Sequence, residues 1–139
     1  MRQEIYQVPS FVKGEYDAAH EVIIDTWTSL MITQSQFQSS IYDVGVPFAV
    51  GHGVKFWIVD TSHAVGVFKK DVQAYIDNTV APMFAQIGIV YFFIVLPQSA
   101  IAKLSAKHIA QINDNQDGMQ TVQVRSVDEA LELIRVRRD

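Results

Sequence analysis

Four consecutive residues, Asp60-Thr61-Ser62-His63, place a carboxylate, two hydroxyls and an imidazole directly after the apolar stretch KFWIVD at 55–60. A carboxylate at such a position can orient a ligand or hold a metal ion. The Ser62 hydroxyl can accept a phosphoryl group, which would add nearly two negative charges at neutral pH. The structural alternative is that Asp60 and Thr61 hydrogen-bond the amides of their own turn. The sequence leaves both interpretations open, and these four residues are its best candidate site.

The remaining histidines do not add a metal site to these residues. His20, His52 and His108 lack the paired spacing by which two ligands share one helix face. His52 and His63 flank the 55–60 stretch, and a strand rising about 3.3 Å per residue would hold them apart. We therefore expect no metal and no cofactor.

Motifs of enzyme active sites are also missing. The sequence contains no G-x-S-x-G elbow, no G-x-x-x-x-G-K-[ST] loop and no G-x-G-x-x-G fingerprint. Ser62, His63 and Asp60 are too close in sequence to meet with the geometry of a catalytic triad. A hydrolase that uses Asp60 and His63 is therefore the least favoured hypothesis, and we expect no enzymatic activity.

Composition predicts a single folded domain over residues 1–139. Apolar residues make up 49% of the chain and charged residues 19%, which is typical of an ordered protein. A net charge of −4 argues against nucleic acid as a partner. The sequence has no cysteine, its first residues lack an apolar signal core, and the apolar run 87–97 is too short to span a bilayer. We expect a cytoplasmic protein without membrane insertion.

The hydrophobic pattern predicts an α/β fold with elements in the order β-β-α-β-α-β-α-β-α. The expected strands are 11–16, 21–27, 55–60, 87–97 and 119–124. The expected helices begin at Thr33, near Phe68 or Lys69, after Pro97 and at Ser126, and the second has a kink or is broken into two pieces at Pro82. Strands 55–60 and 87–97 with the helix between them form a right-handed βαβ unit, whose chemistry belongs at the strands' carboxyl ends. We expect a five-stranded mixed, mostly parallel sheet with four helices on its faces.

Aromatic residues are concentrated on the expected strands. They are Trp27, Phe56, Trp57, Tyr91, Phe92 and Phe93. Aromatic side chains that alternate along strands usually form core. If some of them face an uncovered surface of the sheet, they would instead line an apolar pocket or a dimer contact.

Four segments resemble the STAS family, the sulfate transporter and anti-sigma-factor antagonist domains. They are FWIVD ending at Asp60, a D-x-x-x-x-I-x-x-x-x-x-P helix (Asp71, Ile76, Pro82), GIVYFFIVLP at 88–97 and SVDEALELI at 126–134. The resemblance covers nearly the whole chain and is closest to the small stand-alone bacterial STAS-like proteins, which share the fold of the sporulation anti-sigma-factor antagonist.

This resemblance implies a regulatory role and a protein partner. In the antagonist family a phosphorylatable serine follows an aspartate in a D-S-S-G-like sequence, and Ser62 would align with that acceptor. The sequence departs from the pattern at His63, which replaces the glycine. The leading hypothesis is thus a non-enzymatic regulatory or protein-interaction domain, whose partner is another protein or a second copy in a homodimer. The alternative is a domain that binds a small apolar ligand in a pocket near the Asp60 turn.

Overall fold

The structure is a computed structural model that describes residues 2–138 except 98–117. A six-stranded sheet with strand order β1-β2-β3-β4-β5-β6 forms its centre. The strands are β1 (Arg2–Val8), β2 (Val12–Asp17), β3 (Val22–Trp27), β4 (Phe56–Asp60), β5 (Tyr91–Val95) and β6 (Gln120–Val124). The first three strands pair antiparallel, and β3 to β6 pair parallel. The predicted mixed, mostly parallel sheet is therefore confirmed.

The prediction of five strands is wrong, because β1 was not expected. Among the described strands, β1 lies at the edge of the sheet and pairs only with β2. Its residues Arg2 to Glu4 are exposed, so this strand lacks the apolar run that marks a buried strand. A bulge between Glu4 and Tyr6 further interrupts its alternation.

One long helical segment connects β3 to β4, and a second connects β4 to β5. The first comprises α1 (Gln34–Phe37), η1 (Gln38–Gly45) and α2 (Val46–His52), and the second α3 (Lys70–Tyr75), η2 (Ile76–Val80) and α4 (Ala81–Gln86). The predicted capping box at Thr33 is confirmed, because Thr33 Oγ1 accepts from the Gln36 N–H and Gln36 Oε1 accepts from the Thr33 N–H. The predicted start near Lys69 is also confirmed, since Lys69 is the N-cap of α3. The helix expected after Pro97 falls outside the described residues.

Both segments contain a π-helical stretch that directly precedes a proline-bearing helix. The stretch η1 ends before Pro47 and η2 ends before Pro82, and each proline lies in the first turn of the next α-helix. Proline has no N–H to donate and its ring clashes with the carbonyl four residues earlier, so a wider turn relieves both problems. The helix is not broken into two pieces at Pro82, because helical turns run from Lys70 to Gln86; the irregularity is the π-helical stretch that precedes the proline. At Pro47 the chain likewise stays helical, and α2 ends at His52 with Gly53 as its C-cap.

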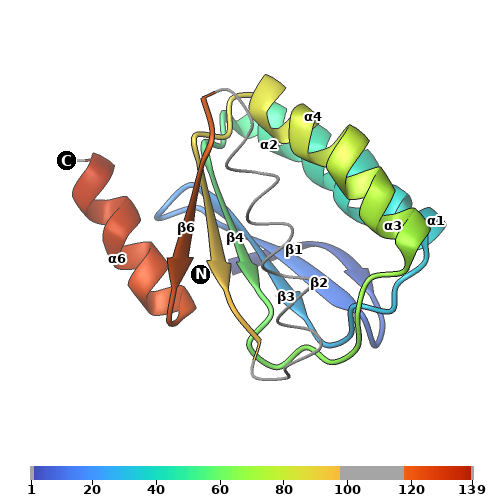
Figure 1. The fold of residues 1–139 in the computed structure, drawn as a ribbon. Coiled ribbons are helices and arrows are strands. Elements are labelled where there is room, and N and C mark those ends of the chain that lie inside the picture. The colour runs from blue at the N-terminus through green and yellow to red at the C-terminus, as the bar shows by residue number, and fades with distance from the viewer. Residues whose placement is uncertain (1, 98–117, 139) are drawn as a thin grey trace.

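The helices of the described residues lie on both faces of the sheet (Figure 1). The two interrupted segments lie side by side over one face, where they bury the larger apolar core together with Trp27, Trp57 and Phe92. The helix α6 (Val127–Arg138) packs on the opposite face through Ala130 and Ile134. None of the helices in the described part of the chain has both the length and the apolar character that a bilayer span requires.

Candidate functional site

The Asp60 turn leaves the carboxyl end of β4, as the sequence predicts. Asp60 Oδ1 accepts two hydrogen bonds from Ser62, one from its N–H at 3.0 Å and one from its Oγ at 2.6 Å. Both residues are half-buried. This is an Asx turn, the structural role considered for Asp60 from sequence. The hydroxyl of Ser62 is therefore held by the carboxylate two residues before it.

Thr61 and His63 point into different environments. Thr61 is buried, and its Oγ1 and N–H both lie within hydrogen-bond distance of the Val95 carbonyl, at 2.5 and 3.1 Å, which fixes the turn to β5. His63 is exposed. No helix begins at this turn, since α3 starts only at Lys70. The structure thus brings Asp60 and Ser62 together, while Thr61 anchors the turn and His63 faces solvent.

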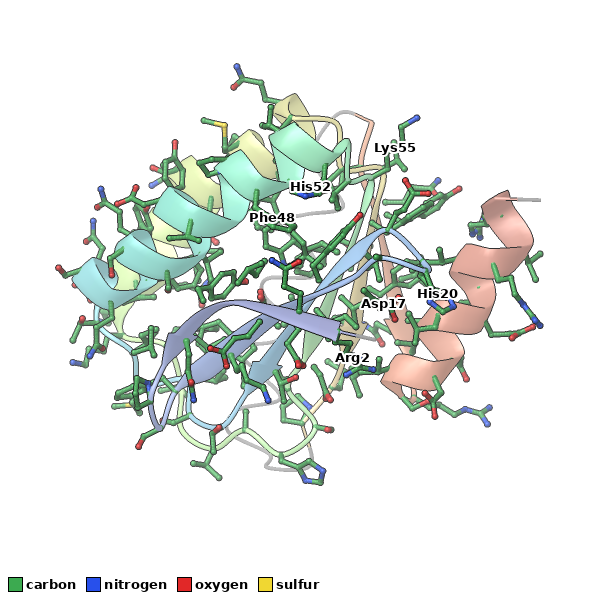
Figure 2. The ribbon with its side chains drawn as sticks, turned by 180° about the vertical axis from the view of Figure 1, so that it is seen from behind. Arg2, Asp17, His20, Phe48, His52 and Lys55 are labelled. Atoms are coloured by element: carbon green, nitrogen blue, oxygen red, sulfur yellow. The ribbon has the colours of Figure 1, made fainter. Side chains whose placement is uncertain are left out.

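His20 and His52 lie at the other end of the sheet and have structural partners (Figure 2). The Nδ1 of His20 lies 3.2 Å from Asp17 Oδ1, and Asp17 also accepts from the His20 N–H. The ring of His52 stacks on Phe48 with centroids 3.9 Å apart. His108 is outside the described residues. Within the described residues no group of three or more histidine or acidic side chains is placed to hold a metal ion.

Burial and hydrogen bonding act in opposite directions on the Asp17 carboxyl. Partial burial acts to raise its pKa, but the two hydrogen bonds from His20 stabilise the carboxylate and leave the pKa below its ordinary value. Asp17 is therefore a carboxylate at neutral pH, and its contact with His20 helps close the β2–β3 hairpin.

A second carboxyl, Asp25, is the polar group that the sequence analysis did not select. It lies on β3 and is only 2% exposed. Its Oδ1 accepts from the Tyr6 hydroxyl, and its Oδ2 accepts from the Trp57 indole N–H at 2.9 Å. The sequence carries a signal for it, because Asp25 is the only charged residue within the otherwise apolar or hydroxyl-bearing VIIDTW strand. A carboxyl group on a buried strand needs hydrogen-bond donors. A buried titratable group of this kind is also a candidate functional residue.

Strand register explains how Tyr6 reaches Asp25. Tyr6 pairs with Gly14, and Gly14 pairs with Asp25, so the three residues form one row across β1, β2 and β3. Glycine in the middle of the row leaves space for the Tyr6 ring to cross it. The bulge in β1 sets this register, because unbroken pairing would place Ile5 opposite Gly14.

Burial has a large effect on the acidity of Asp25. Desolvation raises its pKa to about 7, although the hydrogen bond from Trp57 acts in the opposite direction. The network accommodates both protonation states. Tyr6 Oη can donate to a carboxylate or accept from a carboxylic acid, whereas the Trp57 N–H only donates. A proton on Asp25 therefore belongs on the oxygen that faces Tyr6.

Asp25 lines a cavity between the sheet and the two interrupted helices. The volume of this cavity is about 40 Å³. Five of the lining side chains are aromatic: Trp27, Phe37, Phe68, Phe84 and Phe92. Of the other described residues in the lining, Asp25 and Thr61 are polar and the rest are aliphatic. Val59, in the same row as Asp25, is only half-buried, as expected for a side chain that borders empty space.

Fold and site together define an α/β domain with a mixed sheet, a hydrogen-bonded turn after β4 and one buried carboxyl beside an apolar cavity. Comparisons of the chain with protein-family models, curated proteins and solved structures found no match. The function must therefore be argued from the residues themselves.

Proposed function

We propose that this chain is a non-enzymatic, cytoplasmic regulatory domain of the STAS-like type, which acts by binding a protein partner or a second copy of itself. The observation that carries the proposal is the position of Ser62, half-buried at the carboxyl end of β4 with its hydroxyl 2.6 Å from Asp60 Oδ1. In α/β domains, binding sites are found at the carboxyl ends of the parallel strands, which is where Ser62 lies.

Phosphorylation of Ser62 would change the conformation of this turn. Transfer of a phosphoryl group from a nucleoside triphosphate forms a bond from Oγ to phosphorus, releases the nucleoside diphosphate and passes the hydroxyl proton to solvent. Asp60 then loses the Oγ donor and keeps only the Ser62 N–H. The phosphate adds nearly two negative charges next to that carboxylate. Repulsion at this distance would open the Asx turn and change the surface offered to a partner.

The test compares binding by wild-type protein with binding by Ser62→Ala and Ser62→Asp. A partner is first isolated from the native host with the tagged protein, and intact mass is measured for phosphate on Ser62. We expect Ser62→Ala to keep the partner and Ser62→Asp to lose it. Ser35→Asp, an exposed serine on α1, is the matched control and should bind normally. If neither phosphate nor a partner is found, or if both aspartate variants behave alike, the regulatory proposal fails.

A second function is favoured by the cavity beside Asp25. An apolar, aromatic-lined space that touches Thr61 of the Asp60 turn suits a small apolar ligand. Xenon tests this directly, because it enters apolar cavities without needing polar groups. We expect xenon to shift the methyl resonances of Val59 and Ile41 in a saturable way, with no shift for Val136, which is exposed on α6. Absence of saturable shifts would show that the space is closed to ligands.

A further inference from the structure

The cavity between the sheet and the helices is bordered by one acidic side chain. Among the described residues that line it, Asp25 is the only titratable side chain and none is cationic. The two groups bonded to Asp25, from Tyr6 and Trp57, are neutral donors. When Asp25 is ionised, its negative charge therefore has no cation beside it among the described contacts.

The carboxylate also retains acceptor capacity. Two carboxylate oxygens offer about four lone-pair positions, and Tyr6 and Trp57 occupy one on each oxygen. A ligand that meets Asp25 must therefore donate hydrogen bonds. Alcohols and amines satisfy this requirement, but only an amine in its ammonium form also neutralises the charge.

The aromatic side chains that line the cavity can also bind an ammonium group. Trp27, Phe68 and Phe84 present aromatic rings to the space that Asp25 borders. Aromatic faces attract ammonium groups, most strongly where water is excluded. Indole is the best of these rings, and Trp27 is two residues from Asp25 on the same face of β3. Aliphatic side chains complete the lining and can contact the hydrocarbon part of a ligand.

We propose that the cavity binds a small primary alkylamine, with its ammonium group on Asp25 and its hydrocarbon chain among the aromatic and aliphatic side chains. This inference rests on the second function proposed above and names the chemical class of its ligand. The size of the space restricts the ligand to a few non-hydrogen atoms.

The test uses n-propylamine, 1-propanol and propionate as ligands of similar size and different charge. Binding is followed at pH 8 through the indole N–H resonances of Trp57, which contacts Asp25, and Trp27, which lines the cavity. We expect saturable shifts with propylamine at an affinity about tenfold or more above that of propanol, and no shift with propionate.

Asp25→Asn is the matched variant, since it removes the charge and keeps the shape. The asparagine oxygen can accept from Trp57 while its amide donates to Tyr6, so the variant is expected to fold. Its affinity for propylamine should fall about tenfold or more, to that for propanol, while xenon binding stays unchanged. Equal binding of propylamine and propanol to the wild type would overturn the proposal. If xenon binds but propylamine does not, the amine proposal fails while the apolar-ligand function stands, and if neither binds, both fail.

Discussion

The ring of Tyr6 occupies the space where a side chain on Gly14 would stand. A Cβ built on Gly14 would overlap the ring of Tyr6 at Cζ, which no real side chain could tolerate. On its other side the same ring approaches Gly45 of η1, whose Cβ would lie 3.1 Å from Tyr6 Cε2. Two glycines thus enclose the ring and direct its hydroxyl to Asp25.

Gly14→Ala should therefore be strongly destabilising. The ring cannot move away from the new methyl group because η1 lies behind it, so the hydrogen bond to Asp25 must break or β1 must shift. We expect the free energy of unfolding to fall by about 3 kcal/mol, measured by chemical denaturation. Gly51→Ala is the control, because its Cβ would meet nothing within 4 Å and alanine favours the helix by about 1 kcal/mol. Similar losses in both variants would contradict this role of Gly14.

Tyr6→Phe tests the hydrogen bond without disturbing the packing of the ring. The variant leaves Asp25 Oδ1 without its donor, which penalises the carboxylate more than the neutral acid. We expect the pKa of Asp25 to rise above its value of about 7. The loss of stability should be about 2 kcal/mol at pH 8 and smaller at pH 5. A loss that is the same at both pH values would show that the hydroxyl does not interact with the charge.

Asp25→Asn tests the pH dependence that burial of this carboxyl imposes. The folded-state pKa of about 7 lies above the ordinary value of 3.8, so the folded state holds the proton more tightly than the unfolded state. The stability contributed by this proton is fully present below pH 4 and is lost as the pH rises through 7. Between pH 4 and pH 8 the wild type should lose up to about 4 kcal/mol relative to the variant. Parallel stability curves for the two proteins would contradict the buried titration.

Two substitutions of Asp60 test whether its side-chain oxygen or its charge stabilises the turn. Asp60→Ala removes the acceptor for both Ser62 bonds and should cost about 1 kcal/mol. Asp60→Asn keeps an oxygen at the same position, so its stability should remain close to that of the wild type. Denaturation curves measured side by side decide between them. Equal losses in both variants would mean that charge, rather than the turn geometry, matters at this position.

Local patterns in the sequence predicted most of the elements but not the relationship between them. The capping box of Thr33 and Gln36 and the start of α3 after Lys69 agree with the prediction, because helix caps depend on neighbouring residues alone. The Asp60 turn was also found, since an Asx turn is a local structure. Edge strand β1 was missed because half of its residues face solvent and its pairing partner supplies the rest of its stability.

By itself the sequence determined an α/β domain, the chain order of the five strands that follow β1, and a polar turn after β4. Only the tertiary structure decided that Tyr6, Gly14 and Asp25 form one row and that Trp57 completes the set of donors. The physical reason is that cross-strand register, and the bulge that sets it, depend on contacts between segments distant in sequence. The acidity of Asp25 follows from that assembly, because desolvation comes from the helices that close over the sheet.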